Sequence, residues 1–329
     1  MMPGKNLAVV GATGVVGRAI LDVLKERNVP FKSLRLLASS RSAGKKVEFN
    51  GKTYTMEELT PNSFDEKIDI ALFAAGGATS KEYAKIAASK GCIVIDNSSA
   101  FRMDADVPLV VPEVNPEDIK LNKGIIANPN CSTIQAVVAL NPLHKVYKIK
   151  RIIYTTFQAV SGAGNGGVQD LIRTANGEEP KQFPHTIAGN CIPHIDNFTE
   201  DGYTLEELKM INETRKILHA SDLQITATTV RVPVVTGHSE SINITFENPF
   251  EVADIRKILE EAPGIIVQDD PANKIYPLPL LAAGTDDVYV GRIRRDFSAE
   301  NSLNLWVVAD NLRKGAATNA IQIAEQLIL

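Results

Sequence analysis

The sequence predicts an α/β protein with a doubly wound parallel sheet domain and a second, mixed α/β domain. Short apolar runs alternate with helical patterns between residues 5 and 95, which is typical of a parallel sheet with crossover helices. After residue 130 the pattern changes to longer β-rich segments. The length of 329 residues agrees with two domains, since a domain has roughly 150 residues.

The composition is that of a folded globular protein. Hydrophobic residues make up 44% and charged residues 22%, which argues against disordered, collagen-like and coiled-coil chains. Lys and Arg number 35 against 39 Asp and Glu, and no basic block stands out, so nucleic acid is not an expected partner. Residues 1–10 hold only a short apolar run, which predicts no membrane segment and a cytoplasmic protein.

The cysteines and histidines indicate free thiols and no metal site. Three cysteines at wide spacings form neither a disulfide framework nor a CxxC pattern, which predicts a reducing compartment. The five histidines never occur at the i, i+4 spacing of a helical zinc site.

The first domain is expected to begin with a strand, a glycine-rich turn and a helix. Residues 5–10 are apolar, and within residues 18–27 the apolar Ile20, Val23 and Leu24 recur at helical spacing. The same patterns predict further strands at 34–38, 68–74 and 92–95 and a helix at 80–89.

The second domain is expected to begin near Cys131. A helix is predicted at 132–140 and stops at Pro142, and strands follow at 149–160, 223–235 and 240–246. Residues 176–194 are rich in Gly and Pro and predict a loop. The amphipathic segment 314–329 predicts a helix that packs back on the first domain. The predicted domains are residues 1–130, completed by a helix at 313–329, and residues 131–312.

The turn after the first strand indicates a nucleotide site. Its sequence GATGVVG places Gly11, Gly14 and Gly17 between a strand and a helix, where backbone N–H groups can approach a pyrophosphate. The spacing is GxxGxxG instead of GxGxxG, and a plain tight turn is the alternative. The favoured interpretation is a Rossmann-like dinucleotide-binding domain.

The end of the second strand distinguishes the two nicotinamide cofactors. An NAD site normally has an acid there for the ribose 2′-hydroxyl, but residues 39–45 read SSRSAGK. Arg41, with Ser39 and Ser42, suits a 2′-phosphate because a guanidinium binds phosphate in a bidentate way. NADP is therefore favoured over NAD, and an ordinary solvated basic loop is the alternative.

Cys131 is the candidate nucleophile. In NPNCST (residues 128–133) the cysteine lies where a turn enters a helix, and the unpaired N–H groups and the dipole there lower a thiol pKa. A buried structural cysteine is the alternative. Cys92 opens an apolar strand and Cys191 lies in a loop, so both are interpreted as packing or incidental residues.

His238 is the candidate base for Cys131. It follows RVPVVTG (residues 231–237) at a strand end, where a side chain can face a cleft. His144 and His219 lie near predicted helix C-termini, where an imidazole commonly bonds the last carbonyls, so they are interpreted as structural.

Nearly end to end, the sequence resembles the aspartate-semialdehyde dehydrogenase family. The combination of Cys-Ser-Thr after Pro-Asn with QAVSGAG downstream is highly specific to this family. The matching segments are GATGVVG (11–17), LASSRSAG (37–44), DNSSAFR (96–102), VVPEVN (110–115), NPNCST (128–133), QAVSGAG (158–164), RVP (231–233) and GHSE (237–240).

The resemblance implies a reaction: NADPH-dependent reductive dephosphorylation of L-4-aspartyl phosphate to L-aspartate 4-semialdehyde, in the biosynthesis of lysine, threonine and methionine. Cys131 would attack the acyl phosphate to form a thioester and release phosphate, His238 would act as acid and base, and Gln158 would orient the substrate. The first domain would bind NADP, and the second would be the catalytic and dimerisation domain of a homodimer or tetramer.

The resemblance also implies the substrate contacts. Arg102 and Lys209 would hold the phosphate, Arg231 the carboxylate and Glu206 the amine, with Asn130 also at the substrate. In the segment TLEE, Thr204 and Glu207 can form a capping box, which leaves Glu206 free to point elsewhere. A solvated i, i+3 ion pair between Glu206 and Lys209 is the alternative interpretation from the residues alone.

The cofactor contacts implied by the resemblance fall in both domains. Ser161, Gly162 and Asn311 resemble positions that meet the nicotinamide half of NADP. The segment after Gly167 is short and rich in Gly and Pro, whereas parts of the family carry a longer subdomain there. In the first domain the implied contacts are Gly11, Thr13, Gly14, Val15, Val16, Ser39, Arg41 and Ser42.

Two other functions compete with this interpretation. N-acetyl-γ-glutamyl-phosphate reductase is a sister enzyme that shares the fold, the cysteine and the chemistry, but the 231–238 segment and the Glu206 and Lys209 pair favour the aspartyl substrate. A non-catalytic NADP-binding protein is the second alternative. Such a protein has no need for Cys131, Gln158 and His238 together.

Overall fold

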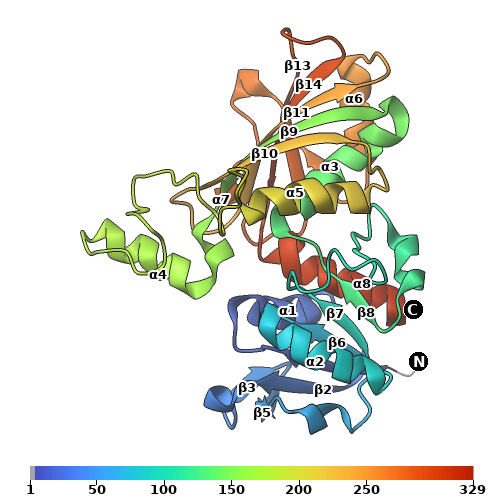
Figure 1. Cartoon of the computed structure of the whole chain (residues 1–329), viewed down its shortest axis with the longest axis vertical. Helices are drawn as coiled ribbons and strands as arrows, with labels where there is room; N and C mark the ends of the chain where they lie inside the picture. Colours follow the sequence, from blue (N-terminus) through green and yellow to red (C-terminus); the bar gives the residue numbers. More distant parts are fainter. Residues whose placement is uncertain (1–3, 329) are drawn as a thin grey trace. The chain divides into compact units, whose positions relative to one another are not determined.

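The computed structural model describes residues 4–328, and residues 1–3 and 329 lie outside the description. Two compact units make up the chain (Figure 1). The first comprises the residues up to Pro129 together with the segment from Ala316 onward, and the second is Asn130–Gly315. Leu329, the last residue of the predicted C-terminal helix, is outside the described residues.

The first unit contains a six-stranded sheet in which every pair of neighbours is parallel. Helices α1 (Val15–Glu26) and α2 (Gly77–Ser89) connect strands, as the alternating pattern predicted. A small antiparallel hairpin, β3 (Lys46–Phe49) and β4 (Lys52–Thr55), was not predicted. The strand order is β5 (Glu57–Glu58), β2 (Phe31–Ala38), β1 (Lys5–Val10), β6 (Ile70–Phe73), β7 (Ile93–Asp96) and β8 (Ile125–Ala127).

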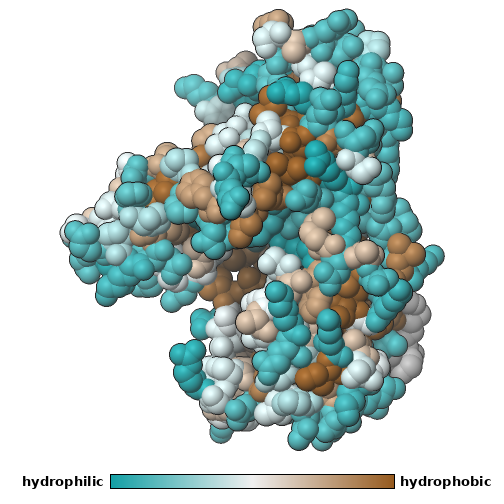
Figure 2. Space-filling view, in the orientation of Figure 1, coloured by the Kyte–Doolittle hydropathy of each residue, from teal (hydrophilic) through white to brown (hydrophobic). Residues whose placement is uncertain are grey.

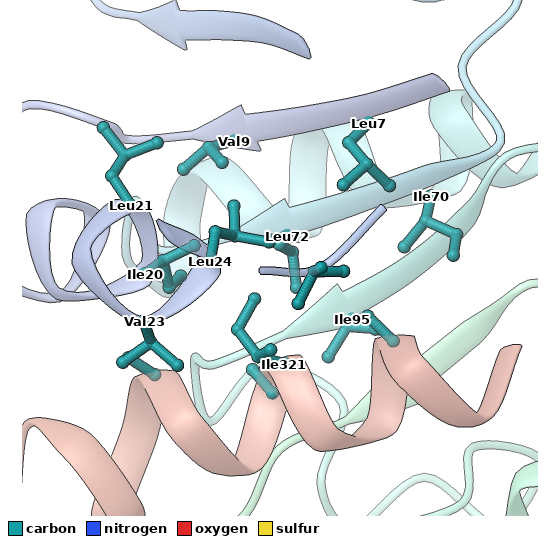
Figure 3. Packing of buried hydrophobic residues seen from close by; sticks show 14 of the residues in the cluster. Leu7, Val9, Ile20, Leu21, Val23, Leu24, Ile70, Leu72, Ile95 and Ile321 are labelled. Carbon is teal, nitrogen blue, oxygen red and sulfur yellow. The ribbon is translucent and has the colours of Figure 1, made fainter. Parts of the chain in front are cut away.

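The C-terminal helix completes the core of the first unit. After a π-helical turn at Arg313–Ala317, helix α8 (Thr318–Ile328) carries Ile321 into the cluster that contains Leu7 of β1 and Leu72 of β6 (Figure 3). Ile20 of α1 belongs to the same cluster, and α1 contacts α8. The predicted packing of this helix on the first domain is therefore confirmed.

The second unit contains a mixed six-stranded sheet. Helices α3 (Cys131–Tyr147), α5 (Leu205–Ile217) and α6 (Val252–Glu261) pack against it. The pairs β9–β10 and β12–β13 are parallel and the others antiparallel. The strand order is β10 (Gln224–Arg231), β9 (Ile149–Gln158), β11 (His238–Phe246), β14 (Ser302–Ala309), β13 (Val288–Arg295) and β12 (Ile265–Val267), of which the last three were not predicted.

Helix α3 runs through Pro142, so the prediction that it stops there is wrong. A proline inside a helix removes one backbone hydrogen bond and crowds the preceding turn. Leu140, Asn141 and Leu143 are nevertheless buried, as are most residues of the preceding turns. Burial of this helix offsets the cost of the proline, because tertiary packing supplies most helical stability in proteins.

The segment between Gly164 and Thr204 combines a helix and a long loop. Helix α4 (Gly164–Ala175) was not predicted, whereas residues 176–194 form the predicted loop. The buried carboxylate of Asp170 on α4 ties this loop down by accepting the backbone N–H groups of Lys181, Gln182 and Phe183. The predicted strand 223–235 ends at Arg231, just before Pro233.

Hydrophilic side chains cover most of the surface visible in Figure 2. Within residues 4–328, none of the helices combines the length and the apolar character that a membrane crossing requires.

Candidate functional site

The glycine-rich turn of the first unit leaves no space for side chains at two of its glycines. Gly11 has a φ of +83°, and a Cβ atom there would lie 2.7 Å from the Ala74 carbonyl oxygen. A Cβ atom on Gly17 would lie 2.2 Å from the Gly11 carbonyl oxygen. The turn follows β1, which lies between β2 and β6 at the point where the strand order reverses. Ligands of doubly wound sheets bind at this point, close to backbone N–H groups.

The remaining predicted cofactor residues of the first unit lie at the ends of β1 and β2. Gly14 is the exposed N-cap of α1. Arg41 is exposed in the short turn Ser40–Ser42 that directly follows β2, and Ser39 is the N-cap of that turn. Three half-buried residues lie at the start of α1, namely Thr13, Val15 and Val16.

Arg102 also belongs to the first unit, and its guanidinium is buried. Its Nε donates to the Asn128 carbonyl oxygen at 2.9 Å and its Nη2 to the Asn97 carbonyl oxygen at 2.9 Å. Its contact with a substrate phosphate stays a prediction.

In the second unit Cys131 is the first residue of helix α3, as the sequence predicted. Its predecessor Asn130 caps the helix, and the side-chain oxygen accepts the N–H groups of Ser132 at 3.0 Å and Thr133 at 3.3 Å. The thiol is half-buried. The first turn of a helix is the electropositive end of its dipole, so this position favours the thiolate.

The other two cysteines lack this setting. Burial raises the pKa of the Cys92 thiol to about 12. Cys191 is exposed in the loop 176–194. Neither has a histidine among its hydrogen-bond partners in residues 4–328.

The His238 ring contacts the Cys131 sulfur. His238 is the first residue of β11 and is 0% exposed, and its Nε2 lies 3.2 Å from Sγ. Its Nδ1 accepts the backbone N–H of Ala159 at 3.0 Å. Burial, together with the nearby Arg231 guanidinium, lowers the pKa of His238 to about 3. The ring is therefore neutral at physiological pH.

The contact that His144 makes differs from the predicted one. It lies in the last turn of α3, but its Nδ1 accepts the backbone N–H of Ile149 at 3.1 Å instead of donating to a helix carbonyl. The difference arises because β9 begins directly after the helix and supplies that N–H group.

Glu206 is a buried carboxylate that gathers three donors. One oxygen accepts the Asn130 amide at 2.9 Å and the Gln158 amide at 3.0 Å, and the other accepts Lys209 Nζ at 3.1 Å. Burial alone would raise the pKa of Glu206, but Lys209 and the two amides outweigh it and lower the pKa to about 2. With 5% of Glu206 exposed, the alternative of a solvated surface ion pair is wrong. The capping box of Thr204 and Glu207 is present, as predicted.

Gln158 has a defined amide orientation. It is the last residue of β9, and its Oε1 accepts the Thr156 hydroxyl at 2.9 Å. Because an ionised carboxylate only accepts hydrogen bonds, the side that faces Glu206 must be the NH₂ group. The second N–H of that group is a candidate donor to a substrate.

Gly162 lies against both the Arg231 guanidinium and the His238 ring. Arg231 is buried at the end of β10, and its Nη1 donates to the Ala159 carbonyl oxygen at 2.7 Å. A Cβ atom on Gly162 would lie 2.8 Å from this Nη1 and 3.3 Å from the His238 ring carbon Cε1. A glycine is therefore required at 162 if both side chains are to keep their positions.

Ser161 and Asn311 form a buried polar pair next to His238. The Asn311 amide donates to the Ser161 hydroxyl at 3.0 Å, and its oxygen accepts the Gly237 N–H at 2.9 Å. The second unit therefore brings together every sequence-predicted residue that it contains.

Sequence reasoning missed three residues that support this site. Glu213 accepts the backbone N–H of Asn130 at 2.6 Å, Thr156 orients Gln158, and Asp196 accepts from Lys209 Nζ at 2.7 Å. Glu213 lies seven residues after Glu206 and so on the same face of α5, which was the available signal. No comparable sequence spacing marks Thr156 or Asp196 as part of the site.

Replacement of Glu206 by Gln is expected to lower the unfolding free energy at neutral pH by about 3 kcal/mol, because a buried group of donors loses its anionic acceptor. The folded pKa of Glu206 lies below its ordinary value of 4.5, so the wild type loses this stabilisation as the pH falls from about 4.5 towards 2. Urea unfolding at several pH values measures the difference between the two proteins. The difference in unfolding free energy between the wild type and Glu206→Gln should shrink on acidification. Glu200→Gln, at an exposed position, is the control. A difference that does not change with pH contradicts an ionised, stabilising Glu206.

Comparison with known proteins agrees with this geometry. Residues 6–122 match the family model described as semialdehyde dehydrogenase, NAD binding domain, and residues 140–314 match the model described as semialdehyde dehydrogenase, dimerisation domain. The aspartate-semialdehyde dehydrogenase of Aquifex aeolicus is 56% identical over 334 residues, covering 99% of this chain and 98% of that protein. That of Bacillus subtilis is 52% identical over 338 residues, covering 98% and 97%.

Solved structures show the same fold. Aspartate semialdehyde dehydrogenase II from Vibrio cholerae is 49% identical with a TM-score of 0.95, covering 99% of this chain and 98% of that one, and a second structure of it is described as complexed with ASA. The Candida albicans enzyme with NADP is 29% identical with a TM-score of 0.78, covering 98% of each chain. Together with the full-length relatives, these matches show that the chain belongs to the aspartate-semialdehyde dehydrogenase family.

Proposed function

We propose that this chain converts L-4-aspartyl phosphate to L-aspartate 4-semialdehyde with NADPH, through a thioester on Cys131. The observation that carries the proposal is the 3.2 Å contact between Cys131 Sγ and His238 Nε2 at the N-terminus of α3. Glu206, Lys209 and Arg231 provide charges for a small zwitterionic substrate in the same unit. Family membership and the Vibrio cholerae enzyme described with ASA support the aspartyl substrate.

The chemistry of the chain centres on the Cys131 sulfur. As a thiolate it attacks the acyl carbon, and the bond from that carbon to the phosphate oxygen breaks. The N-terminus of α3 stabilises the thiolate, and Gln158 offers an N–H that Glu206 does not use.

The substrate contacts follow the chemistry of each group. We assign the amine to Glu206, with Asn130 beside it, and the carboxylate to Arg231, whose guanidinium is held against the Ala159 carbonyl. Lys209 Nζ donates to the carboxylates of Asp196 and Glu206, which keep the ammonium group charged. We assign Lys209 and Arg102 to the substrate phosphate.

The residues fit NADP. Gly11 and Gly17 admit no Cβ atom because the turn packs closely on the Ala74 backbone and on α1, which is the close packing that a pyrophosphate-binding turn requires, and Arg41 suits the 2′-phosphate. Ser161, Gly162 and Asn311 are assigned to the nicotinamide half. The bound cofactor supplies the hydride that reduces the thioester. The Candida albicans relative described with NADP supports this choice.

The purified protein is expected to reduce NADP with aspartate semialdehyde only when phosphate is present, and Cys131→Ala is expected to lose this activity while it still binds NADPH. Cys191→Ala, at an exposed thiol outside the site, is the control and should remain active. Absorbance of NADPH measures turnover. Comparable kcat/KM for N-acetyl-γ-glutamyl phosphate would favour the sister reductase. NADPH binding without turnover would favour a binding protein.

Arg41→Ala is expected to weaken the binding of NADPH at least tenfold and to leave the affinity for NADH unchanged, because only NADPH carries the 2′-phosphate that a guanidinium binds. Titration calorimetry or protein fluorescence measures both affinities. Lys45→Ala, exposed three residues after the turn Ser40–Ser42, is the control for loss of charge. Equal weakening of both cofactors contradicts the assignment to Arg41.

We also propose that the chain forms a homodimer, or a tetramer built from such dimers, through the sheet face opposite α3, α5 and α6. The family model that matches residues 140–314 is described as a dimerisation domain. A shallow cavity of about 280 Å³ lies there, lined in part by Tyr276, Leu278 and Trp306. Leu278 and the neighbouring Leu280 are exposed, which supports burial of this surface by a second copy.

Leu278→Asp is expected to shift the protein from dimer to monomer at micromolar concentration, since it would bury an unpaired charge in the proposed interface. Sedimentation velocity measures the oligomeric state. Phe297→Asp, at a 99% exposed position on the turn after β13, is the control and should leave the dimer intact. A wild type that sediments as a monomer overturns the proposed dimer.

A cytoplasmic location is part of the proposal. The three free cysteines support it, because a reducing compartment keeps thiols in that state.

A further inference from the structure

The loop that follows α4, residues 176–194 (Figure 1), is held by one buried carboxylate. Asp170 on α4 is 0% exposed, and it accepts the backbone N–H groups of Lys181 at 2.9 Å, Gln182 at 2.6 Å and Phe183 at 2.9 Å. Burial alone would raise the pKa of Asp170, but these hydrogen bonds outweigh it and lower the pKa. An ionised carboxylate therefore fixes the backbone position of Phe183.

Two glycines in the first turn of α4 receive side chains of this loop. A Cβ atom on Gly166 would lie 2.6 Å from Gln182 Oε1, and a Cβ atom on Gly167 would lie 3.1 Å from the Phe183 ring carbon Cζ. Any larger residue at 167 would have to displace the ring. The two glycines therefore allow the Phe183 ring to approach the helix closely.

The Phe183 ring contacts the guanidinium of Arg231. Its centroid lies 5.8 Å from Arg231 Cζ, within the range of a cation–π interaction. The same loop also pairs with the backbone of Arg231. The Ile192 N–H donates to the Arg231 carbonyl oxygen at 2.9 Å, and the Arg231 N–H donates to the Ile192 carbonyl oxygen at 2.8 Å. The loop therefore holds Arg231 at its backbone and at its guanidinium.

These contacts leave part of the guanidinium available to a ligand. Nη1 of Arg231 donates to the Ala159 carbonyl oxygen at 2.7 Å, and within residues 4–328 neither Nε nor Nη2 has a protein acceptor. An aromatic ring restricts a cation without using any of its N–H groups. The arrangement suits a carboxylate, which a guanidinium binds through two parallel hydrogen bonds.

We propose that Phe183 is a positioning residue for Arg231 and that Asp170 holds Phe183 in place for this role. The inference rests on the proposed assignment of Arg231 to the substrate carboxylate, and extends it to a loop outside the strands that carry the site. A flexible side chain loses conformational freedom when it binds a ligand, and a ring that already restricts the guanidinium reduces that loss. Phe183 therefore acts on the binding of the substrate carboxylate.

Phe183→Leu is expected to raise the KM for aspartate semialdehyde about three- to tenfold, because leucine keeps an apolar contact but removes the ring. The KM values for phosphate and NADP should change less than about twofold, since Arg231 is not assigned to either of them. NADPH absorbance measures all three. Phe297→Leu, at a 99% exposed position, is the control for the same substitution. An unchanged KM for aspartate semialdehyde, or an equal rise in all three KM values, overturns the proposal.

Asp170→Asn tests the attachment of the loop without reference to activity. The amide replaces one acceptor oxygen by a donor, so the N–H groups of residues 181–183 should exchange with solvent at least tenfold faster. Hydrogen exchange read by mass spectrometry measures this change, and the KM for aspartate semialdehyde should rise with it. Glu179→Gln, exposed in the same loop, is the control. Unchanged exchange, or faster exchange with an unchanged KM, contradicts the role of Asp170.

The outcomes separate this inference from the proposed function. A wild type that does not turn over aspartate semialdehyde would remove the proposed function, and with it the assignment of Arg231 on which the inference rests. Normal turnover by the wild type, with the same KM in Phe183→Leu, would remove the inference alone.

Discussion

The buried carboxylate of Glu206 is the constraint on which the rest of the site depends. An ionised group with 5% exposure is tolerable only when donors surround it. Those donors come from three elements: Asn130 at the start of α3, Gln158 at the end of β9, and Lys209 on α5 itself. Satisfying one charge therefore fixes the start of the helix that carries the nucleophile relative to the sheet.

The register of the second sheet places the other side chains in one row. Arg231 pairs with Gln158 across β10 and β9, and Ser239 pairs with Phe157 across β11 and β9, which brings His238 beside Gln158. Since side chains alternate between the faces of a strand, a slip of one residue would turn this row away from α3. The long β9 strand, paired on both sides, therefore decides whether the chemistry can be assembled.

The three cysteines show how much the surroundings of a thiol matter. Cys92 is buried among apolar groups, and its pKa is raised to about 12. Cys191 is exposed in a loop and does not lie at a helix N-terminus. Cys131 combines a helix N-terminus, which favours the anion, with a histidine ring nitrogen at 3.2 Å. Reactivity at Cys131 thus comes from backbone geometry as much as from the neighbouring side chain.

Local rules in the sequence were sufficient for the alternating strands and helices of the first unit, the glycine turn, the capping box of Thr204 and Glu207, and Cys131 at a helix start. Each depends on residues within a few positions of one another. Helix α3 beyond Pro142, the burial of Glu206 and the contact of the His238 ring with the Ala159 N–H were decided only by tertiary structure. They depend on contacts such as Asn130 with Glu206 or His238 with Ala159, between residues whose proximity no local pattern encodes.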